Sequence, residues 1–252
     1  GFGAAQIGEM ATQMPIVLNA STTSVEDARR IAAKGREVFA LHNFYPRPET
    51  GLDEEYLMQT TARLREAGLS VQAFIPGDTL LRGPLHEGLP TLEAHRHVLP
   101  SAAFVDMALR FGMDDIFLAD PGLSQKEQER IAHFCKTGII CVPAKLEENW
   151  RHLYGKVFTC RMDSPRWLIR FQESRTYSCQ GDIVEPQNCI ARRRGTITVD
   201  NKHYGRYSGE LMLMREDLKA DERVNVIGSV PENAQLLLDR IERGAKFMLV
   251  EE

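Results

Sequence analysis

The sequence has no apolar run of the roughly 20 residues that a membrane-spanning helix needs. It also has no basic stretch followed by an apolar one at its start, which is the pattern of a secretion signal. Its formal net charge is −4, so no overall basic field attracts nucleic acid. These absences argue against a membrane protein, a secreted protein and a nucleic-acid binder, and they favour a cytoplasmic location.

Paired cysteines and the common catalytic motifs are absent too. The five cysteines are an odd number, and none stands in a CxxC pair of the kind that holds structural zinc. We therefore expect reduced thiols and no bound metal at Cys135, Cys141, Cys160, Cys179 and Cys189. The sequence has no Gly-rich phosphate loop, GxSxG elbow, HExxH helix or P-loop, and no cofactor is expected.

The first half of the chain alternates short apolar runs with longer helical patterns. The 252 residues, 43% of them apolar, suffice for one or two domains. Four strands are predicted, over residues 15–22, 37–45, 70–76 and 114–120. The predicted helices cover residues 24–35, 53–67, 91–111 with an interruption at Pro100, and 124–135. This rhythm is typical of an α/β fold with a parallel sheet covered on both faces.

Four βα units are half of a (β/α)8 TIM-type barrel. A half barrel has two open edges and an uncovered interior, which costs free energy. We therefore expect further βα units before Gly1, or pairing with a second copy as a homo-oligomer; a small open α/β sheet is the alternative. The sequence begins GFGAAQIGEM without an initiator methionine, so we expect its start to be a cut or a boundary. Expressed alone, this stretch is expected to be inactive and poorly soluble.

After about residue 137 the helical periodicity fades and short alternating runs appear. These runs are GKVFTC, RWLIRF, GTITVD, GELMLM, RVNVIGSV and KFMLVEE, and turn signals such as DNKHYG and PENAQ lie between them. They predict a β-rich second domain over residues 138–252, a small barrel or sandwich with one helix at 232–241. The first domain would then be residues 1–137.

Polar side chains follow each predicted strand of the first half. In a parallel sheet the carboxyl ends of the strands meet at one edge, where ligands bind. The expected group at this edge comprises Asn19, His42, Asn43, Tyr45, Arg47, Arg82 and Asp120. Amide, imidazole, guanidinium and carboxylate groups together suit a polyhydroxylated, anionic ligand. His42 could instead be a satisfied core histidine, and Arg47 a solvated surface residue.

The loop over residues 76–90 is longer than most βα loops, and such loops are usually functional. Its Glu87 lies in the turn HEGLP, where it is either a general acid or a solvated loop residue. Arg82 is either an anion ligand or a surface residue. Glu93 and Arg96 follow on the predicted helix, where Glu93 could simply complement the helix dipole. In the second half, Arg170 and Arg175 flank a polar run.

Four segments of the sequence resemble one known family. They are HNFYPRPETGL, GPLHEGLPTLEAHR, GTITVDNKHYGRYSGEL and DERVNVIGSV, and they occur in the family's order over nearly the whole chain. The sequence resembles the MupG family of 6-phospho-N-acetylmuramidases. The resemblance implies a (β/α)8 barrel followed by a cyclophilin-like β domain, with the four predicted strands as barrel strands five to eight. It also implies a hydrolase that cleaves phosphosugar glycosides, the 6-phospho-N-acetylmuramyl glycosides, in cytoplasmic peptidoglycan recycling.

The chemistry that the resemblance implies fits the types of the candidate residues. Glycoside cleavage normally uses two carboxyl groups; Glu87 is the catalytic candidate, and the other is upstream of Gly1 or is replaced by the substrate's own N-acetyl group. Arginines suit the 6-phosphate and the lactyl carboxylate, with Arg82 favoured for the phosphate. Asn19, Asn43 and Tyr45 suit sugar hydroxyls. The expected substrate-binding set is Asn19, His42, Asn43, Tyr45, Arg47, Arg82, Glu93, Arg96, Arg170 and Arg175. The alternative is a non-catalytic sugar- or peptide-binding protein.

Overall fold

A computed structural model of the chain describes residues 2–35, 37–175 and 183–252, so Cys179 lies outside the described residues. The chain divides into two compact units, Gly1–Gln128 and Glu129–Glu252. The predicted division at residue 137 stays a prediction. Within the described part, no helix is long and apolar enough to cross a bilayer.

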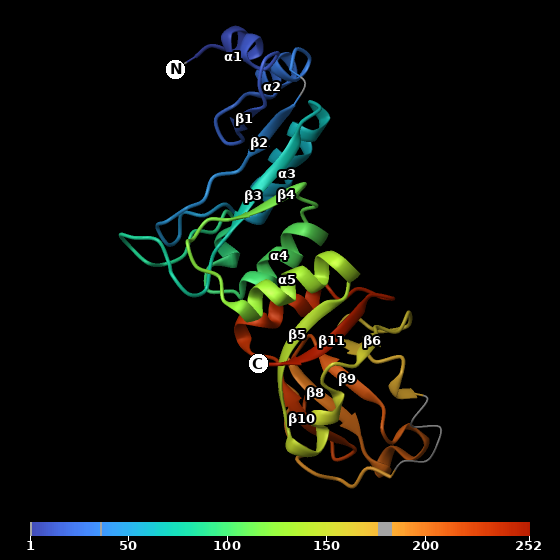
Figure 1. Cartoon of the computed structure of the whole chain (residues 1–252). Coiled ribbons are helices and arrows are strands. Elements are labelled where there is room, and N and C mark those ends of the chain that lie inside the picture. Colours follow the sequence, from blue (N-terminus) through green and yellow to red (C-terminus); the bar gives the residue numbers. More distant parts are fainter. Residues whose placement is uncertain (1, 36, 176–182) are drawn as a thin grey trace. The chain divides into compact units, whose positions relative to one another are not determined.

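The first unit is an α/β structure around a parallel sheet. Its strands, β1 (Ile16–Asn19), β2 (Val38–Leu41), β3 (Ser70–Ile75) and β4 (Asp115–Leu118), pair in the order β1-β2-β3-β4 (Figure 1). Its helices are α1 (Ala4–Met10), α2 (Val25–Ala32), α3 (Glu54–Glu66), the 3-10 turn η1 (Glu93–His95), α4 (Pro100–Leu109) and α5 (Gln125–Thr137), which crosses the division. The four predicted strands and the parallel pairing are confirmed.

Local signals set most helix boundaries in this unit. Ser24 and Asp53 each accept a hydrogen bond from the backbone N–H three residues later, and so begin α2 and α3. The helix predicted from residue 91 is wrong, because η1 is only one turn and the chain is extended at Arg96 and left-handed at His97 (φ 65°). Pro100 then opens α4, where its missing N–H costs nothing.

The two faces of the parallel sheet differ in exposure. Alternate residues such as Leu18, Ala40 and Val71 are at most 5% exposed, and helices α3 and α4 contact β3. On the opposite face, Val17 is 54% exposed and Phe117 is 43% exposed. The sheet therefore has one covered face and one open, largely apolar face.

The second unit is built on a seven-stranded mixed sheet. Its strands are β5 (Ile140–Leu146), β6 (Val157–Thr159), β7 (Leu168–Arg170), β8 (Thr196–Asp200), β9 (Leu211–Met214), β10 (Val224–Ser229) and β11 (Lys246–Glu251), in the order β6-β11-β5-β10-β8-β9-β7. Its 3-10 helices are η2 (Glu148–Leu153), η3 (Lys202–Tyr207) and η4 (Glu232–Asp239), the last in place of the predicted helix at 232–241. The six predicted β runs are confirmed, and β5, parallel to β11, is an addition to them.

The mixed sheet curls until its two end strands meet. The Arg161 N–H donates to the Arg170 carbonyl at 3.0 Å, and the Gln172 N–H donates to the Thr159 carbonyl at 2.9 Å. Inside the curl, the rings of Phe158, Phe171 and Phe247 lie with centroids 4.8 to 5.9 Å apart. This aromatic cluster forms part of the core of the second unit.

Candidate functional site

The open face of the parallel sheet carries an amide pair at its carboxyl end. Asn19 ends β1, and its Nδ2 donates to Oδ1 of Asn43, two residues beyond β2, at 3.4 Å. The Asn19 Oδ1 accepts from the Ser21 N–H at 2.9 Å, which fixes the orientation of that amide. Asn43 is exposed, so its amide can meet a ligand directly. Two of the predicted site residues are thus brought together.

Aromatic rings continue this face beside the amides. The Phe44 and Phe74 rings meet edge to face at 5.2 Å, and the Phe74 and Phe117 rings are tilted at 5.9 Å. The Arg82 guanidinium lies 5.9 Å from the Phe44 ring centre. The sequence reasoning missed these rings, although Phe74 and Phe117 occupy the alternating positions that face away from the helices. Flat rings, amides and a cation together suit a sugar ring that carries a charged group.

His42 lies on the covered side of the sheet. Its side chain is fully buried, and its Nε2 lies 3.0 Å from the Thr61 hydroxyl on α3. Burial lowers the pKa of His42 to about 4, so the ring is neutral near pH 7. Because side chains alternate along a strand, His42 and Asn43 point to opposite faces. A ligand could contact His42 only if this packing opened.

Arg96 joins the two loops that border the open face. Its side chain is only 4% exposed, and its Nε and Nη2 donate to the Glu93 carboxylate at 2.7 and 2.8 Å. The remaining N–H groups donate at 3.0 to 3.3 Å to the backbone carbonyls of Tyr45, Arg47, Glu87 and Gly88. The protein thus occupies every nitrogen of Arg96, and a direct ligand contact would break one of these bonds.

The Glu93 carboxylate binds the backbone of the loop over residues 42–52. Its carboxylate accepts the Glu49 N–H at 2.9 Å and the Gly51 N–H at 2.7 Å. The hydrogen bond from Arg96 is the main reason that the pKa of Glu93 falls to about 2. A Cβ on Gly51 would come within 2.5 Å of this carboxylate, so only glycine fits there. Glu93 and Arg96 therefore shape the loops.

Asp120, buried after β4, fixes the long loop over residues 76–90. Its carboxylate accepts backbone N–H bonds from Gly77, Arg82 and Leu89 at 2.8 to 3.0 Å. The exposed Arg82 side chain is thereby carried on a fixed backbone. One carboxylate thus ties the start, the middle and the end of the loop together.

Backbone strain gathers in the same loops. Glu49, His86 and His97 have φ values of 67°, 58° and 65°, a region that L-residues rarely occupy. Glu87 follows His86, and its carboxylate, 45% exposed, lies 3.9 Å from the His97 imidazole. Strained residues of this kind persist where the surroundings hold them, and they concentrate at functional sites. Of the other predicted residues here, Arg47 is exposed and Tyr45 half-buried.

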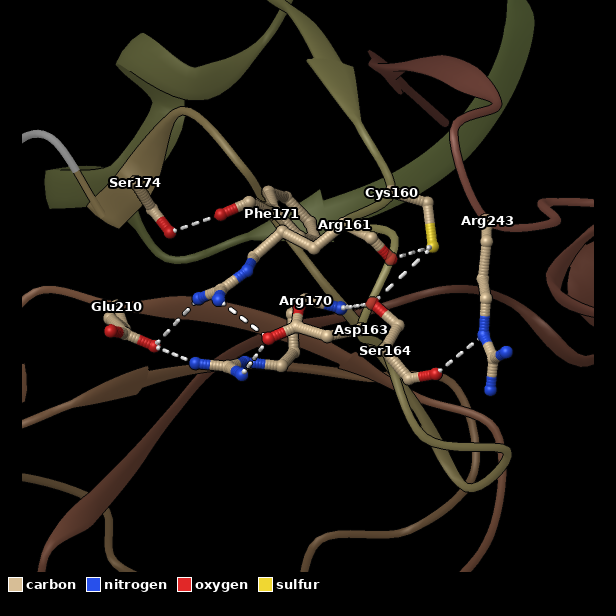
Figure 2. Close-up of polar contacts among 9 residues, drawn as sticks. All are labelled: Cys160, Arg161, Asp163, Ser164, Arg170, Phe171, Ser174, Glu210 and Arg243. Atoms are coloured by element: carbon tan, nitrogen blue, oxygen red, sulfur yellow. Dashed lines mark hydrogen bonds and ion pairs between the residues drawn. The ribbon is translucent and has the colours of Figure 1, made fainter.

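In the second unit, Arg170 belongs to a compact charged cluster (Figure 2). Its guanidinium donates to Glu210 at 2.9 Å and to Asp163 at 3.3 Å. Arg161 donates to the same Asp163 oxygen at 2.8 Å. Arg161, Asp163 and Glu210 were missed from the sequence, because residues separated by up to about 50 positions meet only when the sheet curls. Arg175 is exposed and lies at the end of the described segment.

Asp200 is a buried acid next to this cluster. The residue is 4% exposed, and its Oδ1 has no hydrogen-bond partner in the described part of the chain. Burial, and then the charges of Glu210 and Asp221, raise the pKa of Asp200 to about 7. The folded state therefore holds a proton on Asp200 that the unfolded chain releases near pH 4.

Replacing Asp200 by asparagine is expected to stabilise the protein at alkaline pH. The pKa of Asp200 is higher in the folded state than in the unfolded chain, so ionisation of Asp200 lowers the free energy of unfolding. The full free energy of unfolding is present below about pH 4 and is lost as pH rises towards 7. A shift of about 3 units corresponds to at most roughly 4 kcal/mol. Asp200→Asn should thus raise the free energy of unfolding at pH 8 and change it little at pH 4, measured by urea denaturation.

Asp217→Asn is the matched control for this measurement. Asp217 is an exposed acid that pairs with Arg193, and its pKa is lowered, chiefly by the Arg194 N–H bond. It should give no gain at pH 8. A pH-independent effect of Asp200→Asn would contradict the assignment of a protonated carboxyl.

A cavity of about 520 Å3 lies in the second unit, a size that suits a small ligand. Its walls are mostly apolar, and the polar side chains among them are His152, Lys156, Glu173 and Ser174. Two of these side chains bond the protein: Glu173 accepts from the Thr159 N–H and Ser174 from the Leu211 N–H. The mostly apolar walls suit a ligand with an apolar part.

Comparisons with known proteins cover the whole chain. The family model described as 6-phospho-N-acetylmuramidase, N-terminal (MupG_N), matches residues 1–133, and the C-terminal model of the same name (MupG_C) matches residues 140–250. A search of curated proteins found no match to the chain.

Two solved structures are similar to this one. A conserved protein of unknown function from a locus in Enterococcus faecalis is 33% identical with a TM-score of 0.88, over 100% of this chain and 70% of that chain. An uncharacterized B. cereus protein is 23% identical with a TM-score of 0.80, over 100% of this chain and 75% of that chain. The second likeness concerns the fold alone.

Proposed function

Because the chain belongs to the 6-phospho-N-acetylmuramidase (MupG) family, we propose that it is a glycosidase that hydrolyses 6-phospho-N-acetylmuramyl glycosides. The observation that carries the proposal is the open strand-end face, where the Asn19 and Asn43 amides lie beside aromatic rings and a guanidinium. Such a face offers stacking for a sugar ring, hydrogen bonds for its hydroxyls and a positive charge for its phosphate. The proposed setting is cytoplasmic recycling of peptidoglycan.

Arg82 is the proposed phosphate ligand. It is exposed on a loop that Asp120 holds in place, after the third strand of the sheet. In the finer fold that we propose, this sheet is strands five to eight of a (β/α)8 barrel, and its open apolar face is the barrel interior. Arg82 then follows strand seven, where such barrels frequently bind phosphate. The curled sheet is proposed to be a cyclophilin-like domain.

Glu87 is the proposed proton donor to the glycosidic oxygen. Its carboxyl group is accessible, and the turn that carries it is fixed by the Arg96 bonds to the Glu87 and Gly88 carbonyls. A general acid needs a fixed position relative to the leaving oxygen. The second group of the mechanism is either a further carboxylate or the substrate's own N-acetyl group.

The remaining predicted residues take two kinds of role in this proposal. Asn19, Asn43 and Tyr45 bind hydroxyl and N-acetyl groups, and Arg47, Arg170 and Arg175 bind anionic groups. His42, Glu93 and Arg96 act on the shape of the site, because their side chains are engaged by the protein. No cofactor is part of the proposed mechanism.

The direct test is hydrolysis by the full-length protein. A 6-phospho-N-acetylmuramyl glycoside with a chromogenic aglycone should be cleaved, and the same glycoside without the 6-phosphate should be a poor substrate because Arg82 has no partner. Release of the aglycone measures both. Equal cleavage of the two compounds would contradict recognition of the 6-phosphate. No cleavage of either compound would contradict the proposed glycosidase activity.

A non-catalytic binding protein is the second candidate. The apolar cavity of the second unit favours it, because a cavity of about 520 Å3 can hold a small apolar or peptidyl group without any chemistry. Tight binding of the phosphorylated glycoside without turnover would favour this candidate over the glycosidase.

A further inference from the structure

The charged cluster of the second unit contains a buried donor without an acceptor. The Arg161 side chain is 11% exposed, and its Nη1 has no hydrogen-bond partner among the described residues. The Arg161 Nη1 lies 3.9 Å from Oε2 of Glu210, which is beyond hydrogen-bond range. A buried guanidinium N–H without an acceptor is costly, and it therefore indicates a group that the site receives from outside.

Asp163 occupies the position between the two arginines. One of its oxygens accepts from Arg161 at 2.8 Å and from Arg170 at 3.3 Å, so a single carboxylate oxygen bridges both guanidinium groups (Figure 2). Its side chain is nevertheless 59% exposed. An exposed side chain can leave at little cost, whereas the two arginines are held in place.

The two arginines are positioned by different means. Arg170 is fixed by its bond to Glu210, which is 5% exposed. The Arg170 N–H also donates to the Ser164 hydroxyl at 3.0 Å, and the Arg161 N–H pairs with the Arg170 carbonyl, so the two backbones are locked together. A fixed pair of guanidinium groups is a preorganised receptor for a planar anion.

Charge selects the kind of anion. Arg161 and Arg170 supply two positive charges, and Glu210 neutralises one of them, which leaves one for an incoming group. Asp200 adds no charge below about pH 7, because its buried carboxyl is protonated there. A singly charged carboxylate therefore balances the site, and a doubly charged phosphate exceeds the charge available.

We infer that Arg161 and Arg170 form a carboxylate-binding site in which Asp163 holds the place of the ligand's carboxylate. The incoming carboxylate displaces Asp163 and supplies the acceptor that Arg161 Nη1 lacks. The inference rests on the proposed function for the identity of the sugar, whose lactyl ether carries such a carboxylate. The inference adds a recognition site for that group within the second unit.

The test compares two sugars that differ in the lactyl group. N-acetylmuramic acid carries the carboxylate and N-acetylglucosamine does not, and their binding to the full chain is measured by calorimetric titration. N-acetylmuramic acid should bind at least about tenfold more tightly. Arg161→Gln should abolish this preference. Asp163→Asn should tighten N-acetylmuramic acid binding about fivefold and leave N-acetylglucosamine unchanged, because no internal carboxylate competes.

Arg166→Gln is the matched control, because Arg166 is an 80% exposed neighbour in the same segment and should leave the preference intact. Equal binding of the two sugars would overturn the inference. A preference that survives Arg161→Gln would overturn it too, and so would weaker binding of N-acetylmuramic acid after Asp163→Asn. The Asp163 side chain is exposed, so this replacement leaves the core intact. The readout is independent of hydrolysis: a preserved preference without cleavage of the phosphorylated glycoside would refute the glycosidase alone.

Discussion

Replacing Arg96 by lysine is expected to destabilise the first unit by about 3 kcal/mol or more, because a buried ion pair loses its partner geometry. Arg96 donates from three nitrogens to Glu93 and to carbonyls in two loops. A lysine ammonium concentrates its donors on one atom and cannot reach both loops. The Glu93 carboxylate and the carbonyls would be left without their donors. Urea denaturation followed by circular dichroism measures the effect.

Activity should fall with stability in this variant. The Arg96 bonds fix the carbonyls of Glu87 and of Gly88, which follows it, and a displacement of about 1 Å can cost roughly 100-fold in rate. Arg65→Lys is the control: Arg65 also binds backbone carbonyls and a carboxylate of the same unit, but its side chain is 37% exposed. Equal losses of stability in the two variants, with unchanged kcat and KM, would show that Arg96 has no special role in the loops.

Replacing Glu87 by glutamine is expected to lower kcat on a 6-phospho-N-acetylmuramyl glycoside whose leaving group is a sugar by about 100- to 10,000-fold, the range for loss of a general acid. Glutamine keeps the size and the hydrogen-bonding reach of the side chain but cannot donate a proton. Binding of the unreacted substrate should change little, because the amides, the rings and Arg82 are untouched. Pre-steady-state and steady-state release of the aglycone separate the two effects.

Glu49→Gln is the matched control for Glu87→Gln. Glu49 is also an exposed acid, it lies in the neighbouring loop, and it donates its backbone N–H to the Glu93 carboxylate. Its side chain should therefore be dispensable. Unchanged turnover in Glu87→Gln would remove this residue from the mechanism and leave the family membership intact. A leaving group of low pKa should rescue the variant, since it departs without protonation.

Local sequence predicted the elements of both units well, and the exceptions have physical causes. The strand β5 was missed because Pro143 lies in it, and proline usually interrupts a central strand. In the structure, β10 pairs with β5 only from Lys145 onward, so the missing N–H of Pro143 breaks no bond on that side. The helix expected from residue 91 failed because the two loops need the chain extended at Arg96.

The sequence predicted one part of the candidate site and not the other. The rule that parallel strands end at one edge placed Asn19 and Asn43 together, and their amides do meet. The roles of Arg96 and Glu93 could not be predicted, because their partners lie up to about 50 residues away and include backbone atoms that carry no sequence signal. The pairing of Arg161 with Arg170 depends on the closing of the curled sheet.

The sequence by itself determined the four βα units, the parallel order of their strands and the set of residues at the strand ends. These follow from hydrophobic period, helix caps and the geometry of a parallel sheet, all of which act over a few residues. Only the tertiary structure decided which side chains face a ligand and which hold the loops: His42 is buried against α3, and Arg96 is engaged by carbonyls. Side-chain partners from distant segments meet only when the chain packs, and local patterns do not specify these partners for His42 and Arg96.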